Sequence, residues 1–136
     1  MAHLGGHPVY FSPEEVGIGK RESVEDVARV LSRYVDGIVI RTFAQRDIEV
    51  LAEYASVPVI NALSDDEHPC QTLADLLTIG EAKGSLQGRT IAYIGDGNNV
   101  AASLALGAAL SGACFKIASP NGYELGDVWL ERAREL

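Results

Sequence analysis

The sequence predicts an α/β fold of alternating β-α units, in which a mostly parallel sheet carries helices on both faces. Short runs rich in β-branched residues alternate along the 136 residues with stretches whose apolar residues recur at helical spacing. Several of the β-branched runs are continuously apolar, which is typical of parallel strands buried on both faces. The 47% hydrophobic content is enough to form a core in a chain of this length.

The first part of the chain is predicted to form three strands and three helices. The predicted strands are residues 8–11, 37–42 and 57–62, and the predicted helices are residues 24–35, 45–55 and 68–83. Ser23 has the chemistry of an N-cap for the first helix, behind which Val24, Val27, Leu31, Tyr34 and Val35 recur at helical spacing. The second helix is expected to turn inward Ile48, Leu51, Ala52 and Ala55. Gly84 is expected to end the third helix.

The second part of the chain continues the same alternation. It is predicted to contain a strand at 90–94, a helix at 99–110, a strand at 113–118 and a helix from 128 to 136. The polar, glycine-flanked residues 84–88 are the one plausible boundary in the sequence. We therefore expect two domains, residues 1–84 and residues 89–136.

Charge and composition exclude several classes of partner. The formal net charge is −8 and basic residues do not cluster, so no nucleic-acid partner is expected. No apolar run approaches the roughly 20 residues that cross a bilayer, and the N-terminus does not resemble a signal peptide. We expect a cytoplasmic protein with no membrane partner. Cys70 and Cys114 match no metal or redox spacing, and we expect two buried thiols.

Arg41 is the first candidate site residue, since it ends a predicted strand. In open α/β sheets ligands bind at the carboxyl ends of the strands. A guanidinium is permanently charged and offers several donors, which suits a phosphate or a polarised carbonyl. The alternative is a surface arginine paired with a helix carboxylate, and the residue alone does not decide between them.

The segment 65–71 is the richest candidate. Pro69 suits the first turn of a helix, where its missing N–H leaves no hydrogen bond unmade. This places His68 at the positive end of a helix dipole, where anions bind, and Gln71 one turn further on the same face. The alternative is an acidic helix start that His68 merely caps. A metal site that uses His68 and Cys70 is not expected, because their spacing at such a turn is poor for ligands.

The run Gly95-Asp96-Gly97-Asn98-Asn99 suggests a dinucleotide-binding turn only weakly. Val100 stands where the third glycine of the fingerprint belongs, and the next strand ends in Ser119-Pro120, with no acid to hold a ribose. We instead expect a tight strand-to-helix turn that presents two carboxamides to a ligand.

Taken together, these segments resemble one family. Residues 68–75, His-Pro-Cys-Gln-Thr-Leu-Ala-Asp, resemble the H-P-x-Q-x-L-A-D signature of carbamoyltransferases. Residues 22–33 and 41–43 resemble the helix and strand that precede this signature. Residues 94–100, Ile-Gly-Asp-Gly-Asn-Asn-Val, resemble the ornithine branch of the aspartate/ornithine carbamoyltransferase family. The resemblance covers essentially the whole chain.

The resemblance implies a role for each candidate. Arg41, His68 and Gln71 would hold carbamoyl phosphate, with Pro69 and Cys70 shaping the turn. Arg41 and His68 would polarise the carbamoyl oxygen, and Gln71 would bind the carbamoyl amide. Asn99, with Asn98 beside it, would bind the amino-acid end of L-ornithine. Residues 1–84 would form a carbamoyl-phosphate-binding domain, and residues 89–136 the start of an ornithine-binding domain.

The implied reaction is attack of the ornithine δ-amine on the carbamoyl carbon, which gives L-citrulline and phosphate in arginine metabolism. No metal and no organic cofactor are implied, and the family's enzymes are homotrimers or multiples of trimers. The family's S-T-R-T-R loop would lie upstream of Met1, and its H-C-L-P segment beyond Leu136. By this resemblance the chain is an internal fragment that lacks both ends, and we expect it to be inactive alone.

Two other functions are considered as alternatives to ornithine carbamoylation. The chain is a carbamoyltransferase for another amine, such as aspartate or a modified ornithine, or it is a non-catalytic nucleotide-binding or interaction module. The Asn98-Asn99 pair argues against aspartate. Titration with NAD and ATP against carbamoyl phosphate distinguishes the nucleotide-binding module from both carbamoyltransferases.

Overall fold

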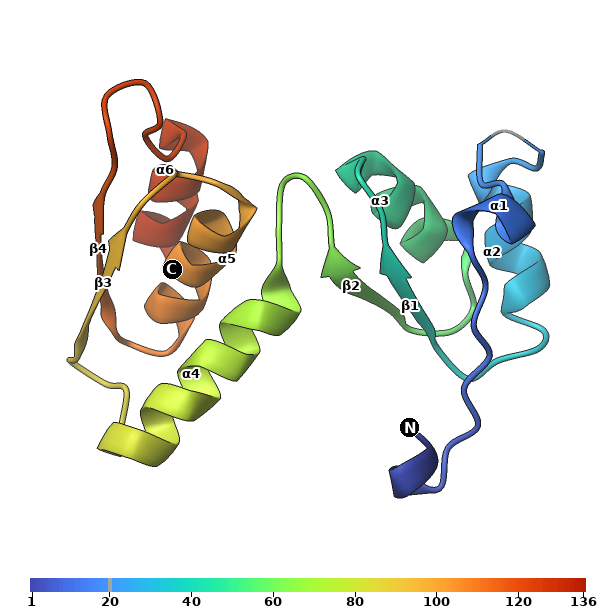
Figure 1. Cartoon of the computed structure of the whole chain (residues 1–136), viewed down its shortest axis with the longest axis horizontal. Helices are drawn as coiled ribbons and strands as arrows, with labels where there is room; N and C mark the ends of the chain where they lie inside the picture. Colours follow the sequence, from blue (N-terminus) through green and yellow to red (C-terminus); the bar gives the residue numbers. More distant parts are fainter. Residues whose placement is uncertain (20) are drawn as a thin grey trace. The chain divides into compact units, whose positions relative to one another are not determined.

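The computed structural model describes residues 1–19 and 21–136. In chain order its elements are η1 (Ala2–Leu4), α1 (Pro13–Val16), α2 (Val24–Leu31), β1 (Ile38–Arg41), α3 (Gln45–Tyr54), β2 (Val59–Leu63), α4 (Pro69–Lys83), β3 (Thr90–Ile94), α5 (Asn99–Leu110), β4 (Cys114–Ala118) and α6 (Asp127–Glu135) (Figure 1). Strands and helices alternate from β1 to α6, so the predicted α/β class is confirmed.

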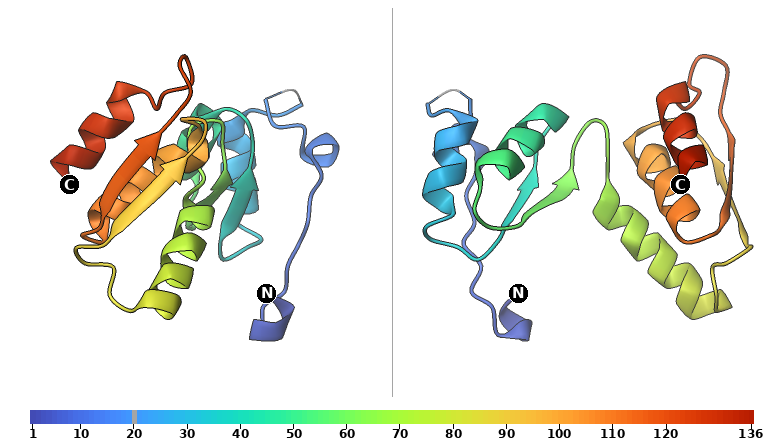
Figure 2. Two further views of the ribbon diagram at one scale, coloured as in Figure 1. Left: turned by 60° about the vertical axis from the view of Figure 1, so that its left-hand side comes forward. Right: turned by 180° about the vertical axis from the view of Figure 1, so that it is seen from behind.

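The strands form two pairs, β1 with β2 and β3 with β4. β3 and β4 are parallel along their whole length, and Figure 2 shows them side by side and pointing in the same direction. In the other pair, the N–H of Ile38 donates to the carbonyl of Pro58 at 2.9 Å, and the N–H of Thr42 donates to that of Leu63 at 3.0 Å. The residue numbers rise together, so β1 and β2 also run parallel.

Internal packing divides the chain into two compact units. The first consists of Met1–Ile38 and Glu49–Val59, and the second of Val39–Ile48 and Ile60–Leu136. Every candidate site residue lies in the second unit. The two domains expected from the sequence, residues 1–84 and 89–136, are defined by the polar link between them and not by packing. They stay a prediction.

The core of the second unit is built around α5. Its alanines Ala101, Ala102, Ala105 and Ala108 are at most 1% exposed. Alanine favours a helix because little side-chain freedom is lost, and its small size lets β3, β4 and α6 approach closely. The larger side chains that pack against α5 are Ile91, Tyr93, Phe115, Ile117, Trp129 and Leu130.

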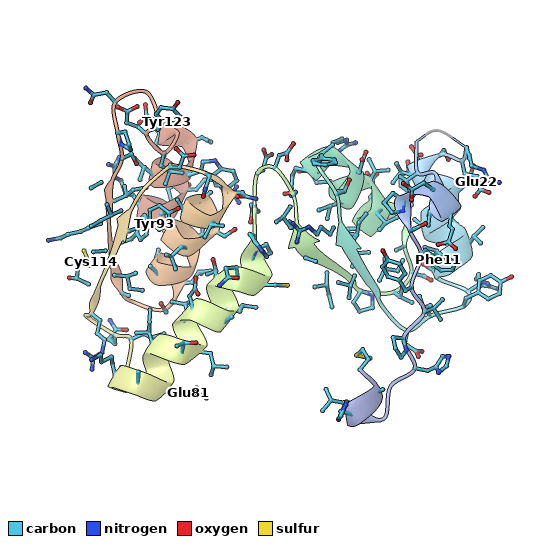
Figure 3. All side chains as sticks on the ribbon, in the orientation of Figure 1. Phe11, Glu22, Glu81, Tyr93, Cys114 and Tyr123 are labelled. Carbon is cyan, nitrogen blue, oxygen red and sulfur yellow. The ribbon has the colours of Figure 1, made fainter. Side chains whose placement is uncertain are left out.

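Within the described residues, helices cover one face of the β3–β4 pair, not both. Burial alternates along both strands, and the exposed residues are Thr90, Ala92, Ile94, Cys114, Lys116 and Ala118. Figure 3 shows Cys114 on the side of the sheet away from α5 and α6. The reason is connectivity: α5 joins two neighbouring parallel strands, and α6 returns to the same face that α5 covers.

The prediction of a strand at residues 8–11 is wrong. These residues form no strand, and Tyr10 is 83% exposed, since no neighbouring strand in the described chain pairs with them. Instead, α1 begins at Pro13 behind a capping box. The Ser12 N–H donates to Glu15 Oε2 at 2.7 Å, and the Glu15 N–H donates to Ser12 Oγ at 3.4 Å. The spacing Ser-x-x-Glu is a sequence signal for this start.

The first predicted long helix is shorter than expected. Ser23 is confirmed as its N-cap, because Ser23 Oγ accepts the Asp26 N–H at 3.2 Å. However, α2 ends at Leu31 and residues 32–34 form a turn, so Tyr34 is 81% exposed rather than packed inward. The apolar spacing continues through residues 34 and 35, beyond the point where the helix gives way to a turn with hydrogen bonds of the i to i−3 kind.

Two expectations of burial are also wrong. Val39 of β1 is 67% exposed, because the described residues cover only one face of that strand. Ala52 of α3 is exposed, although Ile48 and Leu51 are buried. In β1 and α3, the apolar composition of the sequence therefore predicted more buried residues than the structure has. The predicted bounds of α4, β3 and α5 agree with the structure to within one residue.

Candidate functional site

Arg41 ends β1 with an exposed side chain. The alternation of the strand buries Ile38 and Ile40, each 8% exposed, and turns Arg41 to the opposite face. In residues 1–19 and 21–136, no carboxylate forms an ion pair with its guanidinium. The structure therefore does not show the surface ion pair that was the alternative interpretation of Arg41.

A turn over residues 64–67 leads from β2 to His68. The Ser64 N–H donates to the Glu67 carbonyl at 2.8 Å, and the Glu67 N–H donates to Ser64 Oγ at 3.0 Å. The turn is also bonded to the residues after Arg41, because the Asp65 N–H donates to the Phe43 carbonyl at 2.8 Å. Backbone hydrogen bonds thus place the segment after Arg41 beside the segment before His68.

His68 occupies the N-cap position of α4, but its imidazole makes no capping hydrogen bond. The backbone N–H of His68 donates to Ser103 Oγ at 2.8 Å. Nδ1 of His68 is buried and has no hydrogen-bond partner among the described residues. A simple capping role therefore does not account for His68, and a buried polar atom without a partner calls for an explanation such as a functional role.

The first turn of α4 adds a partial positive charge to this site. Pro69 is at the first helical position, as predicted, and the unpaired N–H groups of a helix start favour an anion. Gln71 is exposed one turn in, and its Nε2 donates to Asp75 Oδ1 at 2.8 Å. That bond orients the carboxamide, and its oxygen can accept from a ligand N–H.

The two cysteines are exposed and free, so the prediction of two buried thiols is wrong. Cys70 lies on the first turn of α4, where its Sγ donates to the Asn61 carbonyl at 3.3 Å. Cys114 begins β4 on the open face of that sheet. The position of each cysteine within its helix or strand decides its exposure.

Asn98 and Asn99 have different roles in the structure. Asn98 Oδ1 accepts the N–H groups of Val100 at 3.0 Å and Ala101 at 3.2 Å, so it is the N-cap of α5. The cap uses only the Oδ1 atom of Asn98, so the expectation that both carboxamides are presented to a ligand stays a prediction. Asn99 Nδ2 donates to the Ser64 carbonyl at 2.7 Å, which ties the start of α5 to the turn before His68.

The glycine turn between β3 and α5 is tight, as expected, and its space is filled by the chain itself. A Cβ at Gly97 would lie 2.2 Å from the backbone nitrogen of Leu125, and the Gly97 N–H donates to the Tyr123 carbonyl at 2.8 Å. In dinucleotide-binding folds the equivalent glycine lets a pyrophosphate approach the backbone. Here residues 123–125 occupy that place, which argues against a nucleotide-binding turn.

Arg41, His68 and Asn99 are therefore linked through one segment, residues 63–68, and Gln71 follows one turn later. Sequence reasoning missed Ser64 and Ser103, which hold this segment. Ser103 does leave a signal in the sequence, as a lone hydroxyl among the apolar residues of α5. Within the described chain, no three side chains of His, Cys, Asp or Glu gather as metal ligands. Among the described residues, none of the helices has the length and apolar composition that crossing a bilayer requires.

Comparison with known families identifies two matching models. Residues 1–81 match the model described as "Aspartate/ornithine carbamoyltransferase, carbamoyl-P binding domain". Residues 87–136 match the model described as "Aspartate/ornithine carbamoyltransferase, Asp/Orn binding domain".

Among curated proteins, the chain is 54% identical over 136 residues to the ornithine carbamoyltransferase of Anoxybacillus flavithermus, covering 100% of the chain and 43% of that relative. It is 54% identical over 134 residues to that of Bacillus subtilis, covering 98% of the chain and 42% of the relative. The chain therefore spans less than half the length of these relatives.

Solved structures show the same similarity in three dimensions. The ornithine carbamoyltransferase from Pyrococcus furiosus superposes with a TM-score of 0.95 at 50% identity, over 98% of this chain and 42% of that one. The enzyme from Thermus thermophilus gives a TM-score of 0.91 at 52% identity, over 98% of this chain and 47% of that one.

Proposed function

Because this chain belongs to the aspartate/ornithine carbamoyltransferase family, we propose that the protein carrying it transfers the carbamoyl group of carbamoyl phosphate to the δ-amine of L-ornithine. The products are L-citrulline and phosphate. The observation that carries the proposal is the convergence of the Arg41 strand end, the unpartnered His68 imidazole and the start of α4 on one hydrogen-bonded turn.

The site suits the charge changes of this reaction. When the amine lone pair attacks the carbamoyl carbon, the carbonyl oxygen becomes more negative than in the substrate. Donors from Arg41 and His68 would stabilise this charge more in the transition state than in the ground state. The C–O bond to phosphate then breaks, its electrons leave with the phosphate, and the new C–N nitrogen loses a proton.

The remaining residues suit orientation of the substrates. The carbamoyl NH₂ group donates hydrogen bonds. The Gln71 nitrogen donates to Asp75, which leaves the Gln71 carboxamide oxygen to accept from the carbamoyl NH₂ group. Pro69 and Cys70 shape the turn between His68 and Gln71. Asn99 Nδ2 has two hydrogens, of which one goes to the Ser64 carbonyl, so the second can donate to the carboxylate of ornithine.

The proposal extends to the whole protein. Residues 1–84 would belong to the carbamoyl-phosphate domain and residues 89–136 to the beginning of the ornithine domain. The protein would act in arginine metabolism in the cytoplasm, as a homotrimer or a multiple of trimers, with carbamoyl phosphate and L-ornithine as its small-molecule partners. No metal or organic cofactor takes part in the steps above.

Steady-state citrulline formation by the protein that carries this sequence tests the proposal. Arg41→Ala and His68→Ala should each lower turnover by more than about tenfold, since each removes a donor to the developing oxyanion. Arg29→Ala is the matched control. Arg29 pairs with Asp26 at 3.0 Å and lies over the Tyr54 ring at 4.7 Å, and all three residues belong to the first unit, whereas Arg41 and His68 belong to the second.

The control should retain turnover within about twofold, because exposed ion pairs contribute little. Equal rates for Arg41→Ala, His68→Ala and the unsubstituted protein would show that both residues are structural. Rapid carbamoylation of aspartate or of a modified ornithine, with no citrulline formed, would show that this other amine is the substrate in place of ornithine.

A further inference from the structure

Ser64 is a buried residue whose polar groups are all used. It is 0% exposed. Its N–H donates to the Glu67 carbonyl at 2.8 Å and its carbonyl accepts from Asn99 Nδ2 at 2.7 Å. Its hydroxyl donates to Gln45 Oε1 at 2.6 Å and accepts the Glu67 N–H at 3.0 Å. A hydroxyl that both donates and accepts inside the protein fixes both of its partners.

The partners of the Ser64 hydroxyl belong to the two parts of the candidate site. Gln45 begins α3, four residues after Arg41 at the end of β1. Glu67 is the residue before His68. The hydroxyl is thus a direct side-chain link between the start of α3 and the turn that carries the imidazole.

Ser103 holds the same turn from α5. It is 4% exposed, and its hydroxyl accepts the backbone N–H of His68 at 2.8 Å. Because burial keeps Ser64 and Ser103 from touching a bound substrate, any effect they have on a reaction must pass through the residues that they hold. His68 is held directly by Ser103, and through Glu67 by Ser64.

We propose that the Ser64 hydroxyl is a positioning group for carbamoyl transfer, setting the turn that carries His68 against the strand end that carries Arg41. The inference rests on the proposed function of the same site. It adds a residue that itself touches neither substrate. A displacement of about 1 Å at a reacting group can lower a rate about a hundredfold, so a positioning group of this kind has a measurable effect.

The geometry predicts which substrate is affected. Ser64→Ala removes the bonds to Gln45 Oε1 and to the Glu67 N–H but keeps the backbone carbonyl that Asn99 contacts. Turnover should fall about ten- to a hundredfold and the KM for carbamoyl phosphate should rise, while the KM for ornithine stays within about twofold. Loss of stability alone lowers the amount of active protein and leaves both KM values unchanged.

Ser32→Ala is the matched control. The Ser32 hydroxyl also donates once, to the Ala28 carbonyl at 2.7 Å, and accepts once, from the Ser56 N–H at 3.0 Å, but it lies in the first unit. This variant should lose stability and keep the KM of each substrate. A second pair of variants leaves Ser64 in place. Gln45→Leu removes the acceptor and should reproduce the defect, whereas Gln45→Glu keeps an acceptor oxygen and should largely restore turnover.

A readout that does not depend on turnover separates this inference from the proposed function. The imidazole resonances of His68 in nitrogen-15 spectra should shift in Ser64→Ala and Gln45→Leu and remain unchanged in Ser32→Ala. Unchanged His68 resonances, or a fall in turnover that matches the fraction of unfolded protein with both KM values constant, would overturn the positioning role. Shifted resonances in a protein that makes no citrulline would overturn the proposed function alone.

Discussion

At the scale of single residues, adjacent amides have separate tasks. Asn98 caps α5 through its side-chain oxygen, whereas Asn99 donates to the Ser64 carbonyl beside the candidate site. The sequence shows two equivalent carboxamides, and only the path of the helix start distinguishes them. This difference makes the pair a test of which residue meets a substrate.

Asn99→Ala should raise the KM for ornithine at least severalfold and leave carbamoyl phosphate binding nearly unchanged. The physical reason is that Asn99 contacts the turn before His68 through the Ser64 carbonyl alone, whereas the bonds of the Ser64 and Ser103 hydroxyls to this turn remain in Asn99→Ala. Asn98→Ala is the control, and should lower the free energy of unfolding by about 0.5–2 kcal/mol through loss of the helix cap. Steady-state kinetics and thermal melts measure both. An equal loss of affinity for the two substrates in Asn99→Ala would contradict separate binding regions.

Local signals in the sequence predicted the start and the end of α4 but not the hydrogen bonds between distant polar residues. Pro69 and Gly84 identify the ends of α4 because their backbone preferences act locally. Ser64 could not be predicted as a junction, since its partners Gln45 and Asn99 lie 19 and 35 residues away and meet it only through the fold.

At the scale of secondary-structure elements, the capping box at the start of α1 depends on the charge of the Glu15 carboxylate. The backbone N–H of Ser12, and then its hydroxyl, lower the pKa of the Glu15 carboxyl below its ordinary value of 4.5. A lowered pKa means that the capping box stabilises α1 fully above the ordinary value. That contribution is lost as the pH falls through the folded-state pKa.

The Ser12 amide resonance should therefore titrate with a midpoint below 4.5. Glu15→Gln keeps an acceptor oxygen without an ionisable proton, so the same resonance should not titrate in that variant. A midpoint at or above 4.5 in the unsubstituted chain would show that the capping box does not form in solution.

Two glycines of the second unit, one in a crowded position and one in open space, allow a controlled test of its packing. Gly97→Ala places a Cβ 2.2 Å from the Leu125 backbone nitrogen, which cannot move as a side chain can, and should cost about 1–3 kcal/mol of unfolding free energy. Gly80 lies within α4 with open space around it, and Gly80→Ala should stabilise by about 0.5–1 kcal/mol. Denaturant unfolding measures both. A stable Gly97→Ala variant would mean that residues 123–125 do not fill the glycine turn.

Whether a predicted strand forms depends on its partner strand, and the sequence does not reveal which segments pair. The runs at β3 and β4 were found because each pairs along its whole length and packs one face on α5. Residues 8–11 carry similar apolar composition but have no partner strand in the described chain, and so remain without strand structure. Strand propensity reports how well a side chain fits a sheet, and does not create the sheet.

At the scale of the whole chain, the net charge of these 136 residues opposes the proposed substrate. A formal charge of −8 repels an anion such as carbamoyl phosphate at long range. Within these 136 residues, attraction for carbamoyl phosphate must therefore come from the local field of Arg41 and the start of α4. Screening by salt reduces the long-range repulsion more than the short-range contacts, so salt should weaken binding less than it would for a basic protein.

The central claim is that this site recognises carbamoyl phosphate, and calorimetric titration of the protein that carries this sequence tests it most directly. Carbamoyl phosphate should bind, with a Kd raised at least tenfold by His68→Ala and unchanged within twofold by Arg29→Ala. ATP and NAD should give no saturable heat, since residues 123–125 fill the turn that would hold a pyrophosphate. Saturable binding of ATP or NAD together with no response to carbamoyl phosphate would contradict the account.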